Sequence, residues 1–141
     1  MINDGLKMTG AVAIALNGEV VQEIPNLVVT AGKNFVASRM KDTTKAAMTH
    51  MAIGTNNTTA AVGQTALSAE VTRGALTSTT VSTNTIAYVE TFAAGTGTGA
   101  IVEAGVFNAS SSGDMLCRTV FAVVNKGSAD AMTITWTITV S

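Results

Sequence analysis

The sequence predicts an all-β fold, an antiparallel two-sheet β-sandwich with one short helix. The first observation is the last stretch, Ala131–Val140, in which apolar residues alternate with threonines. Successive side chains of a strand point to opposite faces, so this spacing lines one face with apolar groups and the other with hydroxyls. The second is that turn residues interrupt the chain about every ten residues, as in sandwiches. We expect this stretch to be a central strand, with Trp136 anchoring the core.

The other elements follow from apolar alternation and from the breakers between segments. Asn17-Gly18 predicts a hairpin turn, because both residues tolerate positive φ. Pro25 lacks an N–H donor and ends the second strand. These patterns predict about eight or nine strands, with a jelly roll as the favoured topology and an immunoglobulin-like sandwich without its cysteine pair as the competitor. The expected strands are 7–16, 19–24, 27–29, 48–53, 71–81, 85–93, 100–108, 115–125 and 131–140.

One segment, residues 31–41, has the spacing of a helix, with Thr30 as its expected N-cap. We expect Phe35, Val36 and Met40 to form an apolar stripe that lies on the sandwich. The basic residues Lys33, Arg39 and Lys41 should face water. Residues 55–69 are polar and without period, so they form a long loop, and such loops are usually functional or mobile. The whole chain, 1–141, is expected to form a single jelly-roll domain with a short extended arm at about 1–6.

Composition restricts the possible partners. Charged residues are only 12% of the chain and hydrophobic ones 47%, which suits a protein held against a partner better than a free monomer. A net charge of −1 gives no broad attraction to nucleic acid or to an acidic membrane. No apolar run approaches the roughly 18 residues of a membrane span. Cys117 is the only cysteine, so an internal disulfide is impossible.

Residues that carry chemistry are few, and we expect neither enzymatic activity nor a cofactor. His50 is the only histidine, which is a poor basis for a metal site. Cys117 lies on a predicted strand, where burial would raise its pKa. Glu90 and Glu103 fall on neighbouring predicted strands and could approach one another, but we favour salt bridges, with Arg118 or Arg73 as partners. The glycine run after Ala94 lacks the lysine of a phosphate-binding loop.

The order of the segments resembles a known family. The resemblance rests on NLVVTAGKNFVASRM (26–40), HMAIGTNNT (50–58), TALSAEVTRGAL (65–76) and the run from NTIAYVETF through GSADAMTITWTITV (84–140). Together these look like the small structural proteins of tailed bacteriophages, and most of all the jelly-roll capsid cement, or decoration, proteins of short-tailed phages. The similarity covers most of the chain beyond Leu27 and includes no catalytic signature.

This resemblance implies a protein made in the host cytoplasm and carried on the outer surface of the virion's capsid. Such proteins bridge neighbouring copies of the major capsid protein, often as homodimers at two-fold positions, and stabilise the DNA-filled shell. The partners it implies are therefore the major capsid protein and a second copy, with a dimer favoured over a trimer. No nucleic acid or membrane partner is expected.

We expect the arm and the long loop to contact the capsid or another subunit, with nearby apolar side chains as hot spots. The candidate contact residues are Met1, Ile2, Asn3, Leu6, Asn56, Asn57, Thr58, Thr59 and Val62. One alternative is a trimeric tail-fibre or other tail module that binds a receptor glycan, although aromatic residues are only 4% of the chain. A second alternative is a sandwich-type enzyme domain.

Overall fold

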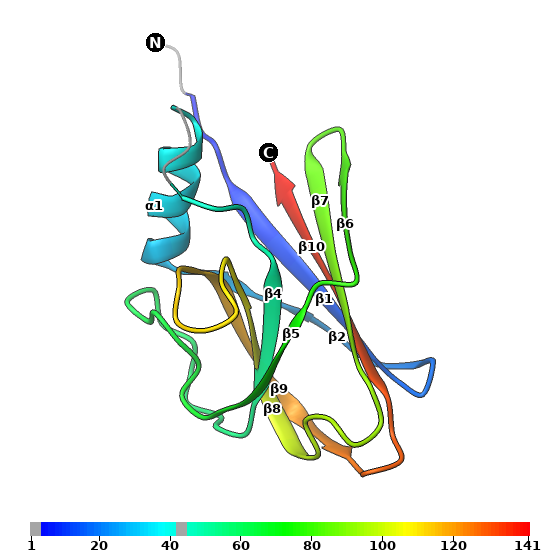
Figure 1. Ribbon diagram of the computed structural model, residues 1–141. Helices are drawn as coiled ribbons and strands as arrows, with labels where there is room; N and C mark the ends of the chain where they lie inside the picture. Colours follow the sequence, from blue (N-terminus) through cyan, green and yellow to red (C-terminus); the bar gives the residue numbers. More distant parts are fainter. Residues whose placement is uncertain (1–3, 42–44) are drawn as a thin grey trace.

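A computed structural model describes residues 4–41 and 45–141, and shows an all-β, two-sheet antiparallel sandwich with one short helix (Figure 1). This confirms the predicted fold class. The elements are β1 (Met8–Leu16), β2 (Glu19–Pro25), β3 (Leu27–Val28), α1 (Thr30–Arg39), β4 (His50–Gly54), β5 (Glu70–Ala75), β6 (Ser78–Ser82), β7 (Thr85–Phe92), β8 (Gly99–Phe107), β9 (Met115–Lys126) and β10 (Met132–Val140).

Each sheet has five strands. Sheet A has the order β2-β1-β10-β7-β6 and sheet B the order β3-β9-β8-β4-β5. The predicted central strand is confirmed, because β10 lies in the middle of sheet A. Its alternation is also confirmed: Trp136 is 0% exposed, and the apolar residues beside it in the strand are buried toward sheet B. Asn17 and Gly18 form the β1–β2 turn with φ of 51° and 84°, as their sequence predicts.

In each sheet, strands that are distant in the chain also pair with each other. β1 pairs with β10, and β3 pairs with β9. Within the sheets, β6 and β7, and also β8 and β9, are sequential antiparallel neighbours. β4 and β5 are neighbours too, so the 55–69 loop leaves and re-enters the same sheet at one end. That loop therefore lies against sheet B and does not cross between the sheets.

The core has two parts. The main cluster fills the space between the sheets and includes Trp136, Phe92 and Phe121. A smaller cluster is formed by five buried residues, which are Val29, Ala52, Leu67, Phe107 and Met115. Leu67 belongs to the 55–69 loop, so the loop contributes to a core of its own on sheet B.

The helix forms where it was predicted, but two details differ. Val29, in extended conformation, occupies the N-cap position without a side-chain cap, and Thr30 is the first helical residue. The N–H of Thr30 bonds to the carbonyl of Val62, 2.8 Å away, so the loop supplies an acceptor at this helix end. Phe35 is buried as expected, whereas Met40 is 78% exposed because the helix ends before it.

The predicted strand 71–81 is wrong, since two strands occupy this region. β5 pairs with β4 in sheet B, while β6 pairs with β7 in sheet A. The chain changes sheet at Leu76 and Thr77: the N–H of Leu76 bonds to the carbonyl of Thr49, just before β4, and the N–H of Thr77 bonds to the carbonyl of Val89 in β7. In β9 an irregularity in the pairing with β8 interrupts the side-chain alternation, and Val123 is exposed while Val124 is buried.

Candidate functional site

The 55–69 loop is anchored at both ends by one buried carboxylate. Glu103 of β8 is 0% exposed, and its oxygens accept hydrogen bonds from three backbone N–H groups of the loop. These are the N–H groups of Asn56 at 3.1 Å, Ser68 at 2.9 Å and Ala69 at 2.8 Å. Hydrogen bonds to an ionised acceptor are the stronger kind, so Glu103 closes the two ends of the loop together.

Arg118 of β9 completes this anchor. Its Nη2 and Nε donate to Glu103 Oε1 at 2.9 and 3.2 Å, and both side chains are fully buried. Its Nη1 donates to the carbonyl of Thr58 at 2.8 Å and to Gln64 Oε1 at 3.1 Å. A buried ion pair needs such additional bonds to offset the loss of hydration. The loop, although it has no regular secondary structure, is therefore held in one conformation.

Local register explains how the two charges meet. Gly105 of β8 lies opposite Arg118, while Glu103 lies opposite Val120, so the charged residues are diagonal neighbours on one face of sheet B. A Cβ at Gly105 would lie only 3.0 Å from the side chains of Leu67 and Phe107, so the glycine leaves room for the smaller core cluster. The salt bridge expected for Glu103, with Arg118 as a candidate partner, is confirmed, whereas the connection of this pair to the loop was not predicted.

The expected contact residues of the loop lie at its surface. Asn57, Thr58 and Thr59 are exposed, and Val62 is 50% exposed; Asn56 is half-buried and its Oδ1 accepts from the N–H of Thr58 at 2.8 Å. The loop carries no charged residue. It thus presents short amide and hydroxyl groups and one apolar side chain on a fixed backbone.

The arm is described only in part. Met1, Ile2 and Asn3 lie outside the described residues, whereas Leu6 is 71% exposed and lies beside Val36 and Met40 of the helix region. The helix consequently lies between the two predicted contact segments. Its first residue bonds to the loop, and its last turn faces Leu6. We call Leu6, α1 and the 55–69 loop together the α1 face.

Glu90 and Glu103 do not form an acid pair. Glu90 and Glu103 were expected on neighbouring strands, but they lie in different sheets: β7 belongs to sheet A and β8 to sheet B. Both are buried in separate networks, and Glu90 accepts from Thr77 Oγ1 at 2.9 Å and from the N–H of Thr91 at 2.8 Å. Each carboxylate therefore has a structural role of its own.

Other reactive groups are also engaged or enclosed. Burial raises the pKa of the Cys117 thiol well above its ordinary value, and burial raises the pKa of Tyr88 to about 12. His50 Nδ1 lies 2.7 Å from Thr49 Oγ1. Among the residues that the structure describes, no group of three or more metal-ligating side chains occurs, and no helix is long and apolar enough to cross a membrane.

A second uncharged surface covers the outer face of sheet A. The register places the threonines of β10 between small residues of β1 and residues of β7. The residues of this face are half-buried or exposed, and they are Ala11, Ala13, Ala15, Thr85, Ala87, Val89, Thr91, Thr133, Thr135, Thr137 and Thr139. Glu23 of β2 lies opposite Ala13, at the border of this face. Uncharged residues therefore cover one face of sheet A as well as the 55–69 loop, in keeping with the small fraction of charged residues in the sequence.

Comparison of the chain with protein-family models, with curated proteins and with solved structures found no match. Its function must therefore be inferred from its own residues and surfaces.

Proposed function

We propose that this protein is a capsid cement, or decoration, protein of a tailed bacteriophage. It binds the outer surface of the icosahedral head, bridges neighbouring copies of the major capsid protein and stabilises the shell. The observation that carries this proposal is the 55–69 loop, an uncharged loop held rigid by a buried ion pair. A loop that is already ordered loses little conformational entropy on docking, so most of its contact energy is available for binding.

Two further observations support this role. The resemblance noted in the sequence is to small phage structural proteins, and the outer face of sheet A is uncharged over three strands. A symmetric shell repeats each contact many times, so a modest interface per copy is sufficient, and simultaneous contacts add avidity. The proposed location is the outer surface of the virion, with the major capsid protein and a second copy of this chain as partners.

The first test is the copy number in purified virions, measured by quantitative mass spectrometry against the major capsid protein. We expect a copy number close to that of the major capsid protein, because a cement protein occupies repeated sites on the shell. A few copies per virion would contradict the proposal and would place the protein in the tail or its fibres, where the search for a glycan receptor should begin.

We predict that Val62→Asp weakens binding to purified heads by about tenfold or more, since an exposed apolar side chain at the centre of an interface is a typical hot spot. Val62 is 50% exposed, so the substitution should leave the unfolding midpoint nearly unchanged. The matched control is Val123→Asp in β9, which is 53% exposed and lies away from the loop. Binding is measured by co-sedimentation with heads that lack the protein. Equal binding by the two variants would remove the loop from the interface.

A further inference from the structure

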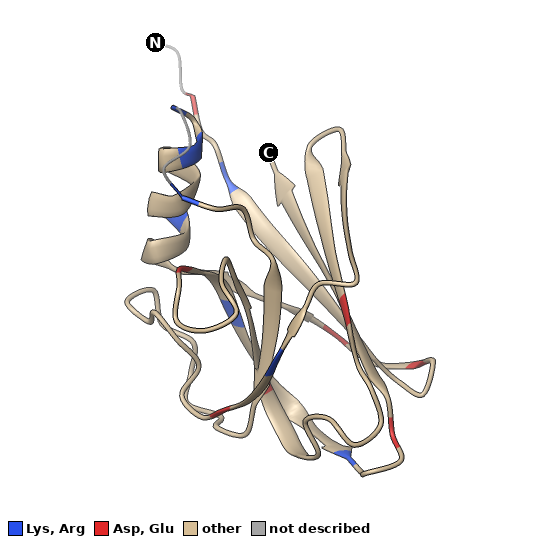
Figure 2. Cartoon of the chain, viewed as in Figure 1, with Lys and Arg blue, Asp and Glu red and all other residues tan. Residues whose placement is uncertain are grey.

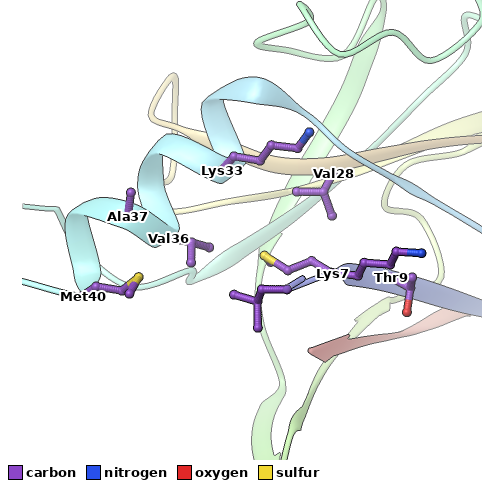
Figure 3. A pocket seen from close by; sticks show the side chains of 9 residues that line it. Lys7, Thr9, Val28, Lys33, Val36, Ala37 and Met40 are labelled. Atoms are coloured by element: carbon purple, nitrogen blue, oxygen red, sulfur yellow. The ribbon is translucent and has the colours of Figure 1, made fainter. Parts of the chain in front are cut away.

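A groove lies between α1 and the first residues of β1 (Figure 3). Its volume is about 460 Å³, and it is lined by Leu6, Lys7, Met8, Thr9, Val28, Lys33, Val36, Ala37 and Met40. Val36 points from the helix toward the strand, and Leu6 and Met40 are more than two-thirds exposed at 71% and 78%. Exposed apolar side chains gathered at a groove are typical of a binding site for an apolar segment.

One wall of this groove is the edge of a strand. The N–H and C=O of Lys7 both bond to Ser141, at 2.7 and 2.9 Å, so they face β10. In an antiparallel ladder the next residue directs its backbone groups to the opposite side, so those of Met8 face α1. The pairing of this edge with β2 begins only at Ala11. Residues 7–9 therefore offer an edge to which another strand can add.

The rim of the groove is positively charged. Lys7 lies on the strand wall and Lys33 on the helix wall, and within residues 4–41 and 45–141 neither has an ion-pair partner. Figure 2 shows several basic residues on and beside α1, with an acidic segment near each end of the helix, and further acidic residues in the β1–β2 hairpin and in the turn before β10. The groove therefore favours an extended segment that combines apolar side chains with carboxylates.

The chain itself contains such a segment. β2 is an edge strand of sheet A, and its residues Val20 and Val21 are 57% and 47% exposed. Glu19 and Glu23 flank them, are exposed and have no ion-pair partner in the described part of the chain. The alternation that turns Ile24 toward β1 directs the backbone groups of Glu23 outward. An apolar edge strand of this kind is normally covered by another chain or blunted by charge.

We propose that the groove of one copy binds the β2 edge of a second copy. β2 adds beside Met8, Val20 and Val21 contact the apolar wall, and Glu19 and Glu23 pair with Lys7 and Lys33. Because the two surfaces differ, the contact is head-to-tail and produces a ring or an open row of copies, unlike the isologous contact of a two-fold dimer. This contact does not depend on a capsid, and on a head it would connect neighbouring copies laterally.

The test is a pair of charge reversals examined by size-exclusion chromatography with light scattering. We expect the wild-type protein to associate as its concentration rises. The double variant Lys7→Glu/Lys33→Glu and the double variant Glu19→Lys/Glu23→Lys should each be monomeric, because each places like charges across the contact. An equimolar mixture should associate again, since the acidic groove of the first variant fits the basic edge of the second, while the remaining surfaces are unchanged.

Several results would overturn the proposal. One is a wild-type protein that stays monomeric at all concentrations, another is a mixture that does not associate, and a third is a variant that associates as the wild type does. Circular dichroism and thermal unfolding confirm that each variant is folded, and the four substituted side chains are all exposed. If the groove variant loses head binding while wild-type protein in solution is monomeric, the occupant is the capsid protein and the second-copy contact is excluded.

Discussion

Replacing Arg118 with methionine is expected to lower the free energy of unfolding by about 3–5 kcal/mol, the usual cost of leaving one partner of a buried ion pair alone. Glu103 would remain buried with only backbone N–H groups around it, and Thr58 and Gln64 would lose their donor. Urea unfolding followed by circular dichroism measures the loss. A loss below about 1 kcal/mol, which is the range of an exposed pair, would contradict this structural account.

The matched control is the exposed ion pair of Lys45 and Asp114, whose charged atoms lie 3.0 Å apart and whose side chains are 40% and 30% exposed. Lys45→Met should cost less than about 1 kcal/mol. The double variant Glu103→Gln/Arg118→Met should recover part of the loss of Arg118→Met, because no charge is then buried without a partner.

The same substitution should loosen the 55–69 loop. Hydrogen exchange should accelerate at the amides of Asn56, Ser68 and Ala69, which donate to Glu103, before it does so in β10. If the loop docks to the capsid, head binding by Arg118→Met should weaken even under conditions in which the variant is fully folded. The loosened loop must then lose its conformational entropy when it binds.

Replacing Trp136 with alanine is expected to cost about 3–5 kcal/mol, as for other large aromatic residues removed from a core. The side chain is 0% exposed and lies in the middle strand of sheet A, between Val12 of β1 and Tyr88 of β7 in the ladder. Sheet B packs against the inner face of sheet A over this side chain, so the surrounding residues cannot easily fill the cavity that alanine would leave.

Trp136→Phe separates packing from hydrogen bonding. The indole Nε1 of Trp136 is buried and has no hydrogen-bond partner among residues 4–41 and 45–141. Phenylalanine keeps most of the ring contacts and removes this unsatisfied donor, so its loss of stability should be less than half that of alanine. Thr135→Ala, on the outer face of the same strand, is the control and should change stability by less than about 1 kcal/mol. Equal losses of stability for Trp136→Phe and Trp136→Ala would contradict this account, because the ring contacts that phenylalanine keeps would then contribute nothing.

The position of much of the candidate site could be predicted from the sequence, but the contacts that hold it in place could not. The 55–69 segment is recognisable because it lacks both the strand and the helix period. Its anchoring depends on Glu103 and Arg118, which come from β8 and β9, far from the loop in the chain. The groove beside α1 likewise depends on the residue at which β2 stops pairing with β1, and no local sequence pattern predicts that residue.

The sequence by itself determined the elements whose signal is local. The alternation around Trp136 specified a strand, and Asn17-Gly18 specified its hairpin turn, because side-chain period and backbone φ preferences act over a few residues. Only the tertiary structure decided that residues 71–81 divide between two sheets, that Val29 instead of Thr30 precedes the helix, and that Glu90 and Glu103 lie apart. These features depend on hydrogen bonds and packing between segments that are distant in the chain, and such contacts override local propensity.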